Sequence, residues 1–91
     1  MGGEPLCSEN TFLTSLIIRE VKKKLPNTKI FVWTGYEYKD LLYNPDPHLK
    51  YILETIDCVI DGPYIQELRD VTLPMRGSSN QSIIYLEHWL N

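Results

Sequence analysis

The stretch Lys29-Ile30-Phe31-Val32-Trp33-Thr34-Gly35-Tyr36 indicates the fold class of this chain. Residues 30–33 form a short apolar run of residues that favour β-structure, which is typical of a strand covered on both faces. Thr34 and Gly35 break the pattern at the carboxyl end of that strand. In α/β sheets, ligands bind beyond the strand ends, and glycine permits a backbone conformation closed to other residues. An ordinary turn from strand to helix is the alternative interpretation.

Two helices are predicted around this strand. Asn10 is the expected N-cap of a helix over residues 11–25, and Asp46 with Pro47 signals the start of a second helix that runs to Thr55. Apolar residues recur at helical spacing in the first helix, which is therefore expected to be core scaffold. These residues are Phe12, Leu13, Leu16, Ile17, Ile18, Val21 and Leu25.

Two further strands complete the predicted sheet. The apolar run over residues 58–60 is closed by Asp61 and Gly62, which repeats the pattern seen at Thr34 and Gly35. Two strands separated by a helix imply parallel neighbours joined by a crossover. Residues 82–86 read as a third strand. The sequence thus predicts one α/β domain over residues 1–91, with about three mainly parallel strands and helices packed on one side.

Composition excludes several classes of protein. The 91 residues are 43% hydrophobic, so the chain is not disordered, and the net charge of −3 with no long basic run does not support a nucleic-acid partner. The only basic cluster, Lys22-Lys23-Lys24, ends a predicted helix, where cations suit the dipole. No apolar run is long enough to span a bilayer and no signal peptide is recognisable. A cytoplasmic location with reduced thiols is therefore expected.

Neither a metal site nor a catalytic nucleophile can be assembled from a motif. Cys7 and Cys58 lie far apart in the sequence and lack partners at metal-ligand spacing. Nothing places His48 or His88 beside a nucleophile. We therefore predict no catalytic residue and no metal ligand in this chain.

Two short motifs carry acidic side chains that could bind a ligand. In Gly2-Gly3-Glu4-Pro5, a carboxylate beside exposed amides could bind an amino group, although the tetrapeptide could equally be a plain turn. Asp61 stands at a strand end and could bind a hydroxyl or amine, or cap the next turn.

A polar loop of Arg76, Gly77, Ser78, Ser79, Asn80 and Gln81 offers a guanidinium and neutral hydrogen-bonding groups around a glycine. It is similar to an anion-holding loop, but it lacks the spacing of a P-loop. A solvated connector is the alternative.

Taken together and in order, these motifs are more specific. Gly-Gly-Glu-Pro, a helix, Val-Trp-Thr-Gly-Tyr, Ile-Asp-Gly and Arg-Gly-Ser-Ser-Asn-Gln resemble the C-terminal portion of the anaerobic ribonucleotide reductase activating proteins. These are small radical S-adenosylmethionine (radical SAM) enzymes of the glycyl-radical activase group. The resemblance implies a partial (βα) barrel fold. It also implies a parent enzyme that cleaves S-adenosylmethionine to generate the glycyl radical on the large subunit of the reductase.

The resemblance also assigns residues. Gly2, Gly3 and Glu4 would hold the amino group of S-adenosylmethionine, and Thr34 and Asp61 would line its carboxylate and ribose sides. The loop from Arg76 to Gln81 would close the cleft or face the reductase partner.

One departure from the family is severe. The CxxxCxxC motif that holds the [4Fe–4S] cluster precedes Gly-Gly-Glu in the family and is absent here, and Cys7 and Cys58 do not match it. The chain is therefore expected to be a catalytically silent part of the activase domain, with residues 30–34 at an exposed sheet edge through which it could self-associate. The alternative function is a free-standing small α/β interaction module without a ligand.

Overall fold

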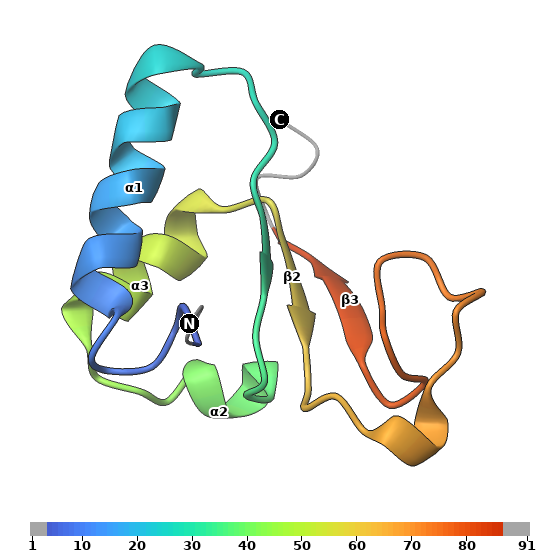
Figure 1. Ribbon diagram of the computed structural model, residues 1–91. Coiled ribbons are helices and arrows are strands. Elements are labelled where there is room, and N and C mark those ends of the chain that lie inside the picture. The colour runs from blue at the N-terminus through green and yellow to red at the C-terminus, as the bar shows by residue number, and fades with distance from the viewer. Residues whose placement is uncertain (1–3, 87–91) are drawn as a thin grey trace.

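The computed structural model describes residues 4–86 as a small α/β unit (Figure 1). None of the helices in this part of the chain combines the length and hydropathy that a membrane-spanning helix needs. In chain order the elements are α1 (Thr11–Lys24), β1 (Phe31–Trp33), α2 (Tyr38–Leu41), α3 (Pro47–Thr55), β2 (Cys58–Asp61), the 3-10 helix η1 (Gln66–Leu68) and β3 (Ser82–Tyr85).

The sheet is mixed, with strand order β1-β2-β3. β1 and β2 are parallel, as predicted, and Val32 lies opposite Val59 in their register. β3 is antiparallel to β2, so the expectation of a mainly parallel sheet is wrong for this strand. A parallel return needs a long crossover, usually a helix, whereas the only helix between these strands is the short η1. β1 lies at one edge of the sheet, as expected for residues 30–34.

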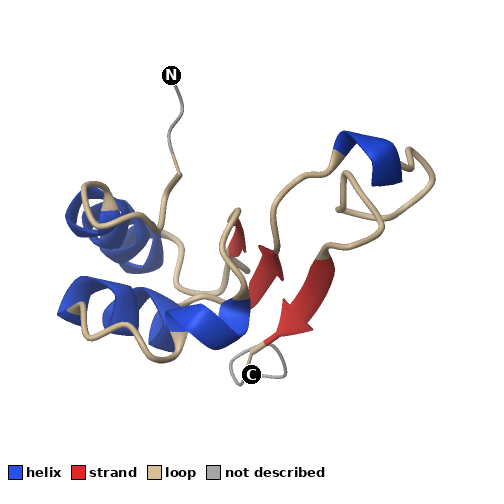
Figure 2. Ribbon diagram, turned by 90° about the horizontal axis from the view of Figure 1, so that it is seen from below, coloured by secondary structure: helices blue, strands red, loops and turns tan. Residues whose placement is uncertain are grey.

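The helices α1, α2 and α3 lie on one side of the sheet, as predicted, and the two views agree on this arrangement (Figure 1 and Figure 2). The cross-strand row Val32, Val59 and Ile84 belongs to the core or packs against it. α3 supplies Leu49 and Ile52, which are fully buried in the same cluster. This cluster therefore lies between the helices and one face of the sheet. Cys58 and Ile60, which alternate with Val59 along β2 and so point to the other face, are also fully buried.

The start of α3 confirms the sequence signal in detail. Asp46 Oδ1 accepts the backbone N–H of His48 at 2.9 Å, and Pro47 occupies the first helical position. The other carboxylate oxygen, Oδ2, accepts the hydroxyl of Thr11 at 2.6 Å. Asp46 therefore caps α3 and ties it to the first residue of α1.

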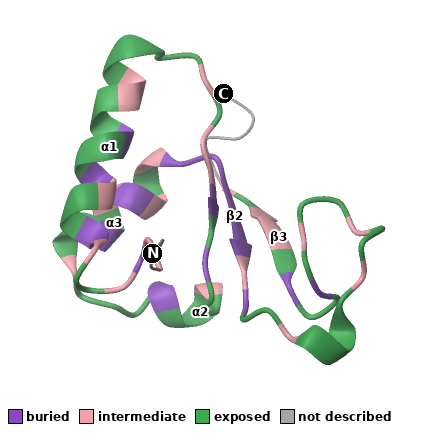
Figure 3. Cartoon of the chain, in the orientation of Figure 1, coloured by how far each residue is buried: buried purple, intermediate pink, exposed green. Residues whose placement is uncertain are grey.

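The core face predicted for α1 is wrong. The helix buries Thr11, Ser15 and Ile18, which lie on the side that packs against α3. Most of the predicted core residues are exposed instead, and α1 is largely coloured as exposed in Figure 3. They are Phe12 at 57%, Leu13 at 59%, Leu16 at 40%, Ile17 at 55% and Leu25 at 60% exposure. Asn10 occupies the N-cap position, but its side chain donates to Glu4 O rather than capping the helix.

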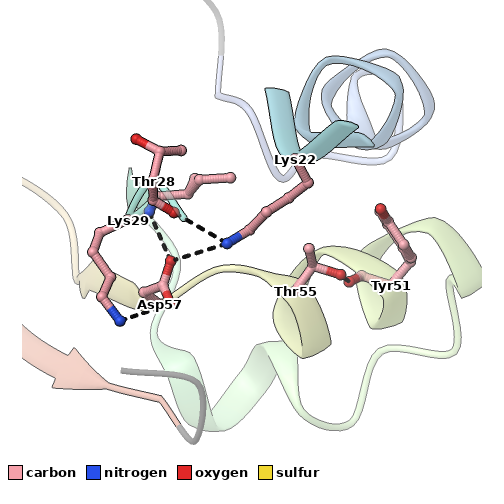
Figure 4. A network of polar contacts seen from close by, with 7 residues as sticks. Lys22, Thr28, Lys29, Tyr51, Thr55 and Asp57 are labelled. Atoms are coloured by element: carbon pink, nitrogen blue, oxygen red, sulfur yellow. Dashed lines mark hydrogen bonds and ion pairs between the residues drawn. The ribbon is translucent and has the colours of Figure 1, made fainter. Parts of the chain in front are cut away.

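A buried aspartate joins α1 to the amino ends of the two parallel strands, which sequence patterns did not indicate (Figure 4). Asp57 is 2% exposed and its Oδ2 accepts the backbone N–H of Ile30 at 2.8 Å. The ammonium groups of Lys22 and Lys29 lie 3.7 and 3.9 Å from its carboxylate oxygens. The opposite charges offset part of the cost of burying this carboxylate.

Candidate functional site

A pocket of about 390 Å³ lies at the carboxyl ends of β1 and β2. This is the edge at which ligands bind in open α/β sheets. It contains two residues that the sequence analysis assigned to a ligand, Glu4 and Thr34, and one residue of the polar loop, Gln81. The full lining is Glu4, Pro5, Trp33, Thr34, Gly35, Gly62, Tyr64 and Gln81.

The Glu4 carboxylate is fixed at the end of β1 by three donors. Oε2 accepts the Thr34 hydroxyl at 2.8 Å and the backbone N–H of Leu6 at 2.9 Å, and Oε1 accepts the backbone N–H of Gly35 at 2.6 Å. A carboxylate offers about four lone-pair positions. The described contacts therefore leave one acceptor position, on Oε1. Gly2 and Gly3, assigned with Glu4 to the same ligand, lie outside the described residues.

The two glycines at the strand ends differ in backbone conformation. Gly62 has a φ of 95°, in the region that side chains disfavour, whereas Gly35 does not have a positive φ. Gly62, and not Gly35, therefore uses the conformation that only glycine readily permits. A Cβ atom added at Gly35 would lie 3.4 Å from Glu4 Oε1.

Asp61 lies at the end of β2, but its carboxylate contacts α2. Oδ2 accepts the backbone N–H of Tyr38, the first residue of α2, at 2.8 Å. Asp61 is not among the residues that line the pocket. The structure therefore brings Glu4 and Thr34 together, while Asp61 binds the start of α2, which precedes it in the chain, and not the turn after it that the alternative interpretation named.

The polar loop over residues 76–81 is held by its own hydrogen bonds. Gln81 Oε1 accepts the backbone N–H groups of Gly77 and Ser78 at 2.8 and 3.2 Å, and Gln81 Nε2 donates to Gly62 O at 3.0 Å. The amides of Gly77 and Ser78, which an anion would need, are thus already engaged. Arg76 Nη1 donates to Gln81 O at 3.3 Å, while Arg76 Nε is buried without a partner among the described residues.

The other two residues of the loop differ in environment. Asn80 Nδ2 donates to Pro63 O at 2.8 Å, and Asn80 Oδ1 accepts the Ser78 hydroxyl at 2.6 Å. Ser79 is exposed and its backbone N–H donates to Leu68 O at 2.9 Å. The loop is therefore a structured wall beside Gly62 and not a loose connector.

Two aromatic residues of the pocket were missed as site residues. Trp33 was interpreted only as part of a buried strand, yet it is 49% exposed and its Nε1 donates to Met75 O at 2.6 Å. Tyr64 packs so closely on Gly77 that a Cβ added there would lie 2.9 Å from its ring. The sequence signal that could have identified Tyr64 is an aromatic residue that closely follows the strand-end glycine, Gly62.

A larger cavity of about 530 Å³ lies away from this site, between α2, α3 and the residue that follows β3. Its lining contains none of the residues that the sequence analysis assigned to a ligand. We base the site on the smaller pocket because it contains the fixed carboxylate and the strand ends.

Comparison with known proteins gives matches to one family model and to one group of relatives. The family model described as a 4Fe-4S single cluster domain matches residues 1–84. Anaerobic ribonucleoside-triphosphate reductase-activating proteins match from Haemophilus influenzae (40% identity; 90% of this chain and 50% of that protein), Pasteurella multocida (39%; 92% and 51%) and Escherichia coli K12 (32%; 93% and 53%). The chain thus spans about half the length of the curated relatives it matches. No solved structure matches it significantly.

The residues of this chain do not fit an iron–sulfur cluster by themselves. A [4Fe–4S] cluster is held by several cysteine thiolates, and the chain has two cysteines. Cys58 is fully buried in β2, where burial and then the nearby Asp57 charge raise the pKa of its thiol. No group of three potential ligands occurs among residues 4–86.

These matches confirm the resemblance to the anaerobic ribonucleotide reductase activating proteins that the ordered motifs indicated. The chain belongs to the 4Fe-4S single cluster domain family and is a homologue of the anaerobic ribonucleoside-triphosphate reductase-activating proteins.

Proposed function

We propose that this chain is the S-adenosylmethionine-binding part of a radical SAM activating enzyme. The full-length protein would generate the glycyl radical on anaerobic ribonucleoside-triphosphate reductase. The observation that carries this proposal is the Glu4 carboxylate, fixed in the pocket with one acceptor position remaining on Oε1. The names of the relatives support the partner. The single helical layer over a strand pair is compatible with part of a (βα) barrel.

The chemistry of the pocket suits an amino-acid ligand. An ammonium group would donate to Glu4 Oε1 in a charge-assisted hydrogen bond. Thr34 would lie on the carboxylate side of the ligand. Asp61 uses Oδ2 to cap α2, so Oδ1 would be the atom that receives a ribose hydroxyl. The loop that ends at Gln81 would form the opposite wall.

The chain alone would be catalytically silent. Reductive cleavage of S-adenosylmethionine needs an electron from an iron–sulfur cluster, and this chain lacks the thiolates for one. We expect no stable cluster after anaerobic reconstitution of the chain with iron and sulfide. A stoichiometric cluster absorbance would contradict this part of the proposal.

Recognition of the amino group can be tested with small probes. We expect L-methionine and S-adenosylmethionine to shift the backbone amide resonances of Thr34 and Gly35, with dissociation constants of about 1 mM or weaker. N-acetyl-L-methionine lacks the ammonium group and should not shift them. Glu4→Gln should abolish the shifts, whereas Glu67→Gln, an exposed carboxylate on η1, should retain them.

Two results would count against this function. Equal shifts with L-methionine and N-acetyl-L-methionine would show that Glu4 does not recognise an amino group. The absence of any shift at tens of millimolar ligand, on the order of ten times the expected dissociation constant, would favour the free-standing interaction module.

A further inference from the structure

The exposed side of α1 carries four adjacent apolar residues. Phe12, Leu13, Leu16 and Ile17, here named the α1 stripe, are 57, 59, 40 and 55% exposed. Their spacing places them along one flank of the first turns of the helix. The stripe ends at the polar pair Glu20 and Lys24, whose charged atoms lie 3.7 Å apart. A contiguous apolar surface with a polar rim is typical of an interaction site.

The opposite flank of α1 is already occupied. Thr11, Ser15 and Ile18 are buried, and Arg19 lies over the ring of Tyr51 on α3 at 4.7 Å. α1 therefore packs against α3 on one side and leaves the stripe exposed, and most of α1 is coloured as exposed in Figure 3. Ile18, with Thr11 and Ser15, is buried, and the ring of Phe12 contacts that of His48 on α3 at 5.0 Å between centroids. Leu13, Leu16 and Ile17 are large apolar residues that remain exposed. This distribution indicates a second neighbour.

We propose that the α1 stripe is the docking surface for an amphipathic helix from the half of the activase length that this chain does not span. This inference rests on the proposed function. The relatives are about twice the length of the matched region, since the chain covers 50% of the Haemophilus influenzae protein. The family model describes a 4Fe-4S cluster domain, and this chain cannot supply the thiolates for such a cluster, so the other half would supply them and would lie against this chain.

Helix geometry fits this occupant. In layered α/β folds, neighbouring helices lie side by side over one sheet face. Residues at i, i+1, i+4 and i+5, as in Phe12, Leu13, Leu16 and Ile17, form the ridges that pack into the grooves of an adjacent helix. Burial of four large side chains would provide a substantial apolar contribution to this contact.

The test uses this chain and, as a separate polypeptide, the half of the Haemophilus influenzae relative that does not align with it. Sedimentation velocity should show a one-to-one complex. The double variant Leu13→Glu/Ile17→Glu should weaken it by at least about tenfold, because two apolar contacts are replaced by charges. Val71→Glu is the matched control, since Val71 is 78% exposed on a loop away from α1. Glutamate supports helix formation, so the double variant should keep its circular dichroism.

A second measurement does not require the separate half to fold alone. The same half is joined to the amino end of this chain, and Leu13→Cys is labelled in a Cys7→Ser background with and without the added half. Labelling at residue 13 is measured by peptide mass spectrometry, because the added half carries the cysteines of the family motif. It should slow by at least about tenfold in the joined protein, because helix docking removes solvent access to the introduced thiol. Labelling of Val71→Cys should not change.

Equal labelling of Leu13→Cys in both proteins would overturn the inference. A complex that is insensitive to Leu13→Glu/Ile17→Glu would also overturn it. A dimer of this chain alone, abolished by the same variant, would assign the stripe to a second copy instead. These outcomes do not depend on the experiments with methionine probes. If those probes show no recognition of the amino group while the complex still depends on the stripe, only the proposed ligand is rejected.

Discussion

The Glu4 carboxylate accepts the backbone N–H of Gly35 at 2.6 Å, although 31 positions separate the two residues in the sequence. The adjacent Thr34 hydroxyl donates to the same carboxylate at 2.8 Å. The turn before α1 and the carboxyl end of β1 are thereby held as one unit. Glu4 thus contributes to the fold as well as to the proposed ligand site.

Glu4→Gln should lower the free energy of unfolding by about 1–3 kcal/mol. The amide has a single acceptor oxygen, so it cannot serve the N–H groups of Leu6 and Gly35 and the Thr34 hydroxyl as the carboxylate does. Urea denaturation followed by circular dichroism measures the change. Glu67→Gln should change stability by less than about 0.5 kcal/mol, as expected for an exposed position. Equal stability of both variants would show that the Glu4 contacts do not contribute.

Asp57→Ala should destabilise the chain by about 3 kcal/mol, because it leaves the partly buried N–H of Ile30 without this acceptor and removes the ion pairs with Lys22 and Lys29. Chemical denaturation provides the measurement.

The matched comparison for Asp57→Ala is Glu20→Ala, which breaks the exposed Glu20–Lys24 pair. Exposed pairs of this kind contribute about 0–1 kcal/mol. If Glu20→Ala lowered the free energy of unfolding as much as Asp57→Ala does, the role of burial would be contradicted.

Asp46 should make stability depend on pH in the acid range. The hydrogen bond from Thr11 is the main cause that lowers the pKa of Asp46 below its usual value of 3.8. A lowered folded-state pKa stabilises the protein above the unfolded value, and this contribution is lost as the pH falls through the folded value. Thr11→Val should therefore cost about 1 kcal/mol at neutral pH and progressively less below about pH 4.

The difference in the free energy of unfolding between Thr11→Val and the parent chain isolates the contribution of Asp46. Urea denaturation measures this difference at each pH from neutral to acid. Other carboxyl groups, such as Asp70, titrate in both proteins and largely cancel. A difference that stays constant down to about pH 2 would contradict the proposed coupling.

The two cysteines should differ in reactivity. Cys58 is fully buried and the pKa of its thiol is raised, first by burial and then by the Asp57 charge, so little thiolate forms near neutral pH. Cys7 is only partly buried. Iodoacetamide under native conditions should modify Cys7, and mass spectrometry should detect modification of Cys58 only after denaturation. Equal native labelling would show that β2 opens readily.

Several local features were predictable from neighbouring residues. Asp46 and Pro47 have the local conformational preferences of an N-cap and a first helical residue. α3 begins at Pro47 and ends at Thr55, as expected. The apolar runs before Thr34 and Asp61 form the predicted parallel pair. The ordered motifs also indicated the family correctly. Local backbone preferences and short-range capping explain these successes.

The sequence by itself determined where the helices and strands form, because capping and hydrophobic periodicity act within a few residues. Only the tertiary structure decided what each side chain meets. Periodicity marked an apolar face on α1, but α3 packs on Ile18 and its small neighbours, which leaves Leu13 exposed. Asp61 caps α2, and Asp57 joins two lysines to the start of β1, through contacts distant in sequence. Such contacts depend on which elements lie next to each other in space, and a single local pattern does not contain that information.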